Sequence, residues 1–127
     1  MSTVNILLLD DSTIILNVCA KLLKHCNMAV RTATSAAEGI RNIVEHGVPH
    51  VVVTDINMPG MSGLELTSRL RQVAPGLPII IMTSGADKDL VRTAKELGVN
   101  GWLIKPFTAE QLIGKVTEAL ASQRQTA

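Results

Sequence analysis

Three carboxylates of this chain stand where apolar runs give way to polar residues. Asp10 and Asp11 follow an Ile-Leu-Leu-Leu run, and Asp55 ends the run Val-Val-Val-Thr-Asp. Carboxylates held close together repel one another, and the pKa of one of them rises unless a cation neutralises the group. Carboxylate oxygens, with a backbone carbonyl and waters, suit a hard divalent ion such as Mg²⁺. The three acids are therefore candidate metal ligands, and an acidic helix start, the plainer interpretation of Asp10 and Asp11, is compatible with this role.

A hydroxyl and an ammonium group occupy equivalent positions after two further apolar runs. Thr83 ends the run Pro-Ile-Ile-Ile-Met-Thr, and Lys105 follows Trp-Leu-Ile. A bound cation, a lysine and a hydroxyl are what phosphoryl transfer requires, because that chemistry depends mainly on positioning and charge neutralisation. A carboxylate can itself be the nucleophile and form an aspartyl phosphate. Asp55 is the candidate nucleophile because its run is the central one.

These groups come together only if the apolar runs are the strands of one parallel sheet. Five such runs alternate with segments of helical periodicity, which is typical of a parallel sheet covered by helices on both faces. Right-handed crossovers then give the strand order 2-1-3-4-5, in which the carboxyl ends of the strands meet at one edge. The sequence predicts an α/β, flavodoxin-like, doubly wound sheet of five strands with five helices.

Capping boxes and stop residues delimit the elements. A Ser or Thr three residues before Glu or Gln predicts helix starts at Ser35, Ser62 and Thr108. Gly114 interrupts the last helix at a cost of about 1 kcal/mol, and nothing in the sequence explains it. The expected strands are residues 5–9, 28–33, 51–55, 78–83 and 100–104, and the expected helices are residues 12–26, 35–46, 62–74, 87–97 and 108–121. From the helical spacing of apolar residues, the inward side chains of the first helix are predicted to be Ile14, Ile15, Val18, Cys19, Leu22 and Cys26, and those of the third Leu66, Leu70 and Val73.

Composition limits the classes of protein to which the chain can belong. With 127 residues, of which 46% are hydrophobic, it suits one domain over residues 1–127, with a polar tail from about residue 122. The net charge is +1 and there is no basic run, so no nucleic-acid partner is expected. Neither a long apolar span nor a signal peptide is present, and a cytoplasmic protein without membrane insertion is expected. Cys19 and Cys26 are too far apart on one helix for a disulfide and are expected to be buried thiols.

Four short motifs lie in a fixed order along the chain. They are the pair Asp10-Asp11, the segment Thr54-Asp-Ile-Asn-Met-Pro-Gly-Met-Ser-Gly63, the pair Thr83-Ser84, and Lys105-Pro106-Phe107. Together they resemble the receiver domain of two-component response regulators, in particular its stand-alone, CheY-like type. The resemblance covers essentially the whole chain and implies the fold described above.

The resemblance also implies a role for each acid and for the lysine. Asp55 would accept a phosphoryl group from a sensor histidine kinase. Asp11, Asp55 and the backbone carbonyl of Asn57 would bind Mg²⁺, or alternatively Mn²⁺, and Asp10 would hold a metal-bound water. Lys105 would pair with the phosphoryl oxygens.

Further residues would carry the switch that the resemblance implies. Thr83, followed by Ser84, would move to bond the phosphoryl group, and Trp102 would swing inward with it, where the family usually has Tyr or Phe. Trp102 taken alone is more often a packing residue. The Lys105–Pro106 peptide would be cis. Gly85 offers no side chain to orient an attacking water, so fast self-dephosphorylation is not expected.

The expected function is a signalling switch and not an enzyme acting on other substrates. Phosphorylation of Asp55 would shift a pre-existing equilibrium and alter the face made by the fourth helix, the fifth strand and the fifth helix. The partners would be a histidine kinase and a downstream protein, such as the motor switch of chemotaxis, and the protein would be a monomer. That face carries the basic groups of Lys88, Arg92, Lys95 and Lys115.

Three alternatives remain beside the switch. The chain could be a phosphorelay intermediate or a phosphate sink, which would use the same site. An aspartate-nucleophile phosphatase needs a second Asp two residues after the nucleophile, and this chain has Asn57 there. A flavodoxin-like electron carrier is disfavoured because the acidic first loop would repel the phosphate of FMN.

Overall fold

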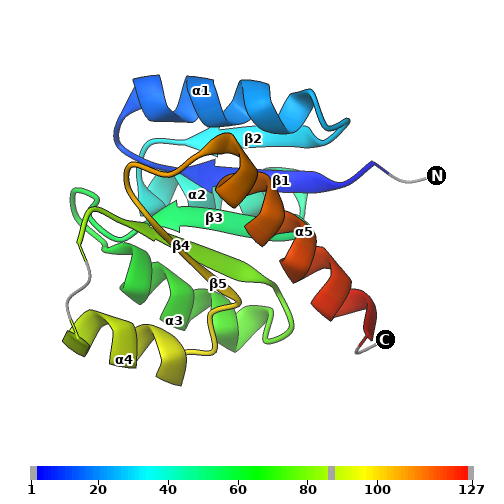
Figure 1. Ribbon diagram of the computed structural model, residues 1–127. Helices are drawn as coiled ribbons and strands as arrows, with labels where there is room; N and C mark the ends of the chain where they lie inside the picture. Colours follow the sequence, from blue (N-terminus) through cyan, green and yellow to red (C-terminus); the bar gives the residue numbers. More distant parts are fainter. Residues whose placement is uncertain (1–2, 86–87, 126–127) are drawn as a thin grey trace.

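The computed structural model describes residues 3–85 and 88–125, in which five strands alternate with five helices (Figure 1). The strands are β1 (Asn5–Leu9), β2 (Ala29–Ala33), β3 (Val51–Asp55), β4 (Ile79–Thr83) and β5 (Gly101–Ile104). The helices are α1 (Thr13–Lys24), α2 (Ala36–His46), α3 (Gly63–Val73), α4 (Lys88–Glu96) and α5 (Ala109–Gln125). The alternation predicted from the sequence is confirmed.

The strands form one parallel sheet in the order β2-β1-β3-β4-β5, which confirms the predicted flavodoxin-like, doubly wound fold. Strand β3 lies between β1 and β4, and all five of its residues are buried. Asp55, the last residue of β3, is paired in register with Met82 of β4. Because all strands point the same way, the residues that end them gather at one edge of the sheet.

Helices cover both faces of this sheet. Figure 1 shows α1 and α5 on one face and α2, α3 and α4 on the other. Successive strand residues point to opposite faces, so each strand contributes to two cores. The core beneath α1 and α5 includes Ile6, Leu8, Val53, Leu16, Leu23 and Leu112, and the core on the other face includes Leu7, Val52, Ile81, Leu66 and Leu70.

The predicted capping boxes lie at helix starts, but only one of them forms both of its hydrogen bonds. The backbone N–H of Gln111 donates to Thr108 Oγ1 (3.1 Å), and the N–H of Thr108 donates to Gln111 Oε1 (2.9 Å). At α2 the Ser35 hydroxyl accepts from the N–H of Glu38, whereas the carboxylate of Glu38 accepts from the hydroxyl of Thr34. The sequence therefore located the helix starts, and local geometry decided which half of each box forms.

The predicted inward face of α1 is wrong in part. The buried side chains are Leu16, Cys19, Ala20 and Leu23, whereas Ile14 is 75% and Val18 54% exposed. Both sets repeat at helical spacing, so periodicity alone could not choose between them. Packing of Leu16, Cys19, Ala20 and Leu23 against the sheet decides which set is buried.

Several further expectations are corrected. Helix α1 ends at Lys24, and Asn27 then adopts a positive φ of 63°, so Cys26 lies beyond the helix and is exposed. Cys19 is buried and both thiols are free, as predicted. Val73, the last residue of α3, is 76% exposed, because the buried face of this helix is formed by Gly63, Leu66, Thr67 and Leu70.

The last two helices also differ from the prediction at their ends. Helix α5 continues to Gln125, past the predicted polar tail at Ser122. Asp87, the predicted first residue of α4, lies outside the described residues, and α4 is described from Lys88. None of the described helices is long and apolar enough to cross a bilayer.

Candidate functional site

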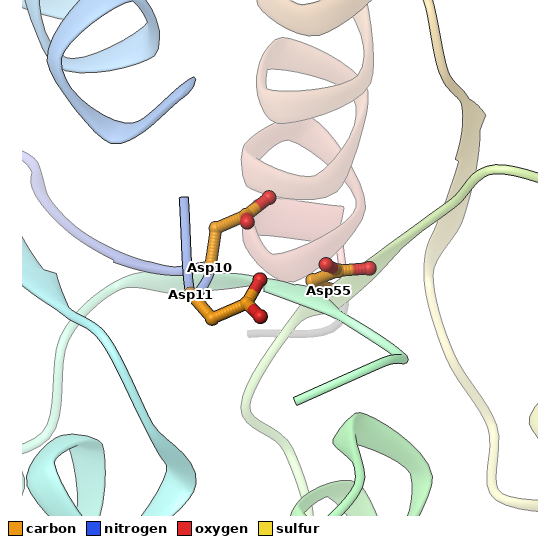
Figure 2. A group of neighbouring side chains, drawn as sticks. All are labelled: Asp10, Asp11 and Asp55. Atoms are coloured by element: carbon orange, nitrogen blue, oxygen red, sulfur yellow. The ribbon is translucent and has the colours of Figure 1, made fainter. Parts of the chain in front are cut away.

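The three candidate metal ligands meet at the carboxyl edge of the sheet. Asp10 and Asp11 follow β1, and Asp55 is the last residue of β3 (Figure 2). One carboxylate oxygen from each of them lies within 4.8 Å of the others. Asp10 and Asp55 are buried and Asp11 is exposed. The parallel sheet thus brings together acids that are more than forty positions apart in the chain.

Backbone hydrogen bonds fix the direction in which two of these carboxylates point. The N–H of Ser12 donates to Asp10 Oδ1 (2.9 Å), at the start of α1. The N–H of Asn57 donates to Asp55 Oδ1 (3.3 Å), in the loop after β3. Each carboxylate is therefore held by the turn that follows its strand, and Ser12, rather than Asp10, is the N-cap of α1.

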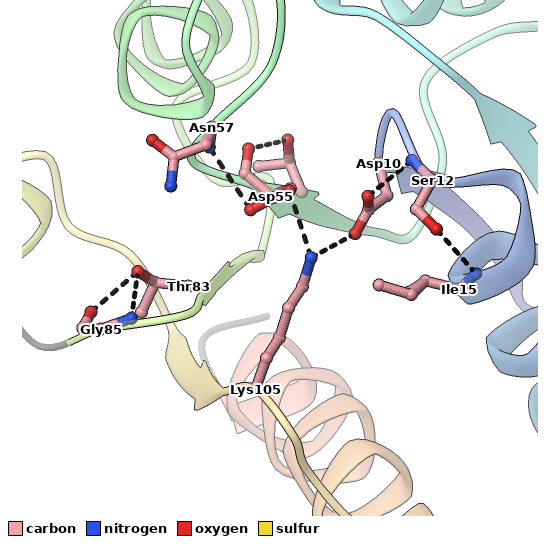
Figure 3. Close-up of polar contacts among 9 residues, drawn as sticks. Asp10, Ser12, Ile15, Asp55, Asn57, Thr83, Gly85 and Lys105 are labelled. Atoms are coloured by element: carbon pink, nitrogen blue, oxygen red, sulfur yellow. Dashed lines mark hydrogen bonds and ion pairs between the residues drawn. The ribbon is translucent and has the colours of Figure 1, made fainter.

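Lys105 bridges the two buried carboxylates (Figure 3). Its ammonium nitrogen, Nζ, lies 2.6 Å from Asp10 Oδ2 and 3.2 Å from Asp55 Oδ2. The peptide bond between Lys105 and Pro106 is cis, as the resemblance implied. The sequence predicted Lys105 as a partner of phosphoryl oxygens, but its contact with Asp10 was not foreseen. A cation therefore already compensates part of the negative charge of the cluster.

The environment shifts the ionisation of Asp55 and Lys105. Burial raises the pKa of Asp55, and the nearby charge of Asp10 acts in the same direction, while the hydrogen bond from Lys105 opposes them. For Lys105, burial lowers the pKa, but the hydrogen bonds and charges of Asp10 and Asp55 outweigh it, and the pKa is raised. A second cation at this site would relieve the repulsion between the acids that Lys105 only partly neutralises.

Gly63, the first residue of α3, is a site residue that sequence reasoning did not identify. A Cβ atom at this position would lie 2.2 Å from the backbone oxygen of Asp55. The N–H of Gly63 also donates to the Ile56 carbonyl oxygen (2.9 Å). The start of α3 therefore packs directly on the Asp55 peptide, which only glycine permits. The sequence held a signal, because Gly63 ends the motif that contains Asp55, but the motif gave Gly63 no contact with the Asp55 peptide.

The predicted switch residues form no hydrogen bond with the acids in the part of the chain that the structure describes. Thr83 is buried at the end of β4, and its hydroxyl donates to the Gly85 carbonyl oxygen (2.8 Å) and accepts from the Gly85 N–H (3.2 Å) (Figure 3). Within the described chain the Thr83 hydroxyl has no hydrogen bond to Asp55 or to the ammonium group of Lys105, although the backbone N–H of Lys105 donates to the Thr83 carbonyl oxygen (2.7 Å). Ser84 is exposed, and Trp102 is half-buried against the core beneath α2, α3 and α4. The predicted roles of these residues stay predictions.

The donor set fits a hard divalent cation. It consists of carboxylate oxygens from three residues, one of them exposed to solvent and able to share a metal with water. The carbonyl of Asn57 follows Asp55 by two residues in the same loop. No sulfur or imidazole ligand belongs to the cluster within the described residues, which distinguishes it from a zinc site.

Comparison with known proteins assigns this arrangement to a family. The sequence matches the response regulator receiver domain over residues 6–117. The chain belongs to the response regulator receiver domain family. This receiver domain is 32% identical over 115 residues to the chemotaxis protein CheY-3 of Vibrio cholerae, covering 87% of each chain. It is also similar to the crystal structure of a receiver domain protein from Clostridium thermocellum, with a TM-score of 0.91, 31% identity and coverage of 98% and 99%.

Other relatives are longer than this receiver domain. It is 34% identical over 119 residues to the uncharacterized transcriptional regulatory protein YesN of Bacillus subtilis, and these residues cover 91% of the chain but only 32% of that protein. The chain thus spans about a third of the length of YesN. Receiver domains belong to two-component systems, in which they interact with histidine kinases and downstream effectors and generally bind Mg²⁺ through acidic residues.

Proposed function

We propose that this receiver domain is phosphorylated on Asp55 by a histidine kinase. A carboxylate oxygen of Asp55 would attack the phosphorus of a phosphohistidine whose other ring nitrogen is protonated. The P–N bond would break, its electron pair would stay on the nitrogen, and the histidine would leave as a neutral imidazole. The product would be an aspartyl phosphate. The single observation that carries the proposal is the convergence of Asp10, Asp11, Asp55 and Lys105 at the end of the central strand.

The charges around Asp55 support this chemistry. The attacking carboxylate is itself negative, and so is the phosphoryl group that it would accept. Lys105 Nζ lies 3.2 Å from Asp55 Oδ2 and would pair with a phosphoryl oxygen. Asp10, Asp11, Asp55 and the carbonyl of Asn57 would hold Mg²⁺ or Mn²⁺, and this ion would supply charge neutralisation for the transferred group.

The nearest exposed surface supports a protein as the phosphoryl donor. Ile14 and Val18 on α1, which the sequence predicted to be buried, project into solvent beside Pro106 and Phe107. This apolar surface includes Lys105 at its border, so it adjoins the site. A donor protein that brings a phosphohistidine to Asp55 would cover it.

We further propose that the aspartyl phosphate acts as a switch for a downstream protein. The Thr83 hydroxyl would exchange its bonds with Gly85 for a bond to the phosphoryl group, and Trp102 would move with it. The altered face would be that of α4, β5 and α5. The likeness to CheY-3 favours a chemotaxis partner, and a phosphorelay intermediate would use the same site. The chain would catalyse only its own phosphorylation and dephosphorylation, and its cytoplasmic location and monomeric state stay predictions.

The decisive experiment incubates the protein with Mg²⁺ and a small phosphodonor such as acetyl phosphate and measures the intact mass. The wild type should gain one phosphoryl group, and Asp55→Asn should gain none. Glu45→Gln, which removes an exposed carboxylate on α2, should be phosphorylated as the wild type is. An adduct of equal amount on Asp55→Asn would rule out Asp55 as the acceptor.

Steady hydrolysis of a phosphate monoester would point instead to a phosphatase. A phosphatase would release inorganic phosphate in many equivalents per protein, whereas a receiver would not act on such a substrate. Both assays use the same preparation of protein. The intact mass reports phosphorylation of a receiver, and the release of inorganic phosphate reports a phosphatase.

A further inference from the structure

Arg31, in the middle of the edge strand β2, is a cation that no carboxylate of the described residues neutralises. Its side chain is half-buried between the strand and α2. Nη1 donates to Asn42 Oδ1 (3.0 Å) and to the carbonyl oxygen of Gly47 (3.0 Å). Because Asn42 belongs to α2 and Gly47 caps the end of that helix, these two bonds fix the plane of the guanidinium group. The positive charge of Arg31 is therefore held in place by neutral groups.

The other side of this guanidinium group has no acceptor within the part of the chain that the structure describes. Both N–H groups of Nη1 are used, which leaves the Nε–H and the two N–H groups of Nη2. Nε is buried without a hydrogen-bond partner, and such a buried donor is costly. In the planar guanidinium group the Nε–H and one N–H of Nη2 point in the same direction, and this fork matches two oxygens of a carboxylate or a phosphate. Arg31 thus presents a fixed fork of unpaired donors.

This fork belongs to a pocket of about 350 Å³ whose lining favours an anion. The lining residues are Asn5, Arg31, Thr32, Asn42 and His46, and none of them is an acid. Each of these side chains has an N–H or O–H group that can donate a hydrogen bond. The carboxylate of Glu45 lies 3.9 Å from His46 Nε2, but Glu45 is not part of the lining. An anion in the pocket would therefore meet donors and one fixed positive charge.

The pocket is separate from the candidate phosphorylation site. Asn5, which lines the pocket, is the first residue of β1, whereas Asp10 and Asp11 follow the last residue of that strand. Strand β2 forms one edge of the sheet and β5 the other, as Figure 1 shows. The pocket and the acid cluster have no residue in common. An anion bound to Arg31 would therefore require no residue of the acid cluster.

We propose that this pocket binds a small molecule that carries a carboxylate or a phosphate group. Two oxygens of this oxyanion would accept hydrogen bonds from Nε and Nη2 of Arg31. The bond to Nε would satisfy a buried donor that the described residues leave unpaired, and this gain would contribute to the affinity. The amide nitrogen of Asn42 and a ring nitrogen of His46 supply further donors in the wall. The site goes beyond the proposed phosphorylation of Asp55 and adds a ligand-binding function at the β2 edge.

Titration followed by NMR tests the proposal on the whole protein. Inorganic phosphate and acetate are the two probes, added in Tris buffer with EDTA at constant ionic strength. The proton–nitrogen signals of the Arg31 Nε–H and of the Gly47 amide should shift saturably with at least one probe, with a Kd of about 10 mM or below. The probe that binds more tightly identifies the charged group of the ligand. Asp55→Asn should bind this probe as the wild type does.

Four variants distinguish the fork from positive charge in general. Arg31→Lys keeps the charge and lacks the fork, so the affinity should fall by about tenfold or more. Arg41→Gln removes an exposed arginine of α2 outside the lining and should bind as the wild type does. His46→Glu adds a carboxylate to the lining and should lower the affinity by about tenfold or more, whereas His46→Gln should lower it by less than about threefold. Because His46 is exposed, its two variants decide the question if Arg31→Lys fails to fold.

Four results would overturn the proposal. The first two are the absence of saturation with both probes, and shifts of equal size when sodium chloride is added instead. The others are equal affinities of the wild type and the folded Arg31→Lys variant, and equal affinities of His46→Glu and His46→Gln. Phosphorylation of Asp55, measured by intact mass, tests the proposed function separately, so a failure of anion binding would leave that function standing.

Discussion

Replacement of Lys105 by methionine tests whether this one ammonium group holds the acid cluster together. Methionine keeps the unbranched side chain as far as the ε position and removes the ammonium group with its charge. Lys105 Nζ lies 2.6 Å from Asp10 Oδ2 and 3.2 Å from Asp55 Oδ2. The side chain of Lys105 is only 19% exposed, that of Asp10 1% and that of Asp55 7%. At an effective dielectric constant of about 20, each attraction amounts to roughly 5–6 kcal/mol before the cost of desolvation is subtracted.

The net effect is smaller than these attractions. Removing one partner of a buried ion pair costs about 3–5 kcal/mol, because a charge stays buried without compensation. The partial exposure of Lys105 and the ability of Asp55 to take up a proton place the expected loss near the lower end, about 3 kcal/mol at pH 7 in EDTA. For a domain of this size that loss lowers the melting temperature by roughly 10 °C.

The assay is urea or thermal unfolding of the wild type and Lys105→Met, in EDTA and in Mg²⁺. Mg²⁺ should stabilise the variant more than the wild type, because Lys105 Nζ no longer competes for the oxygens of Asp10 and Asp55. Lys115→Met is the matched control, since its exposed pair with Glu118 at 3.8 Å should change stability by less than about 0.5 kcal/mol. A Lys105→Met variant as stable as the wild type in EDTA would refute the reasoning.

Three further predictions concern Gly63, Gly114 and the ionisation of Asp55. Gly63→Ala should lower the free energy of unfolding by about 1–3 kcal/mol and slow phosphorylation, because its Cβ would collide with the Asp55 carbonyl. Gly85→Ala is the control: a Cβ there has nothing within 4 Å, so the free energy of unfolding should change by less than about 0.5 kcal/mol. Equal stability of the two variants would contradict this reasoning. Because a Cβ at Gly114 also has nothing within 4 Å, Gly114→Ala should raise the free energy of unfolding by about 0.5–1 kcal/mol in urea titrations, and a loss would show that the open space at Gly114 is structurally needed. Burial raises the pKa of Asp55, so the folded protein binds the proton of this carboxyl group more tightly than the unfolded chain does. Without metal, the free energy of unfolding of the wild type relative to Asp55→Asn should therefore fall as the pH rises from 3.8, the ordinary pKa, through the raised pKa. A difference that does not depend on pH would refute the raised pKa of Asp55.

The gathering of the acids and Lys105 was predictable from the sequence because each of them ends a strand or follows directly after one. Asp10, Asp55, Thr83 and Lys105 follow four apolar runs, and a parallel sheet aligns the ends of such runs at one edge. The strands are short and apolar, and the capping residues mark the helices between them, so the order of elements is encoded locally. The identity of the acids, the lysine and the hydroxyl then limits the chemistry.

Contacts between distant segments were not predictable. The bridge from Lys105 to Asp10 joins residues 95 positions apart, and the packing of Gly63 on the Asp55 carbonyl depends on how α3 meets β3. The bonds of the Thr83 hydroxyl to Gly85 depend equally on the conformation of the loop that follows β4. No pattern in the sequence reports such distances.

The sequence by itself determined the fold and the edge of the sheet at which Asp10, Asp11 and Asp55 gather, because periodicity and strand-ending residues are local properties of the chain. The tertiary structure decided which face of α1 is buried, and so left Ile14 and Val18 in solvent beside the site. It also shows that open space surrounds Gly114. Helical spacing gives two compatible stripes in α1 and no reason for a glycine in α5, and only the position of each helix against the sheet distinguishes a packed residue from an open one.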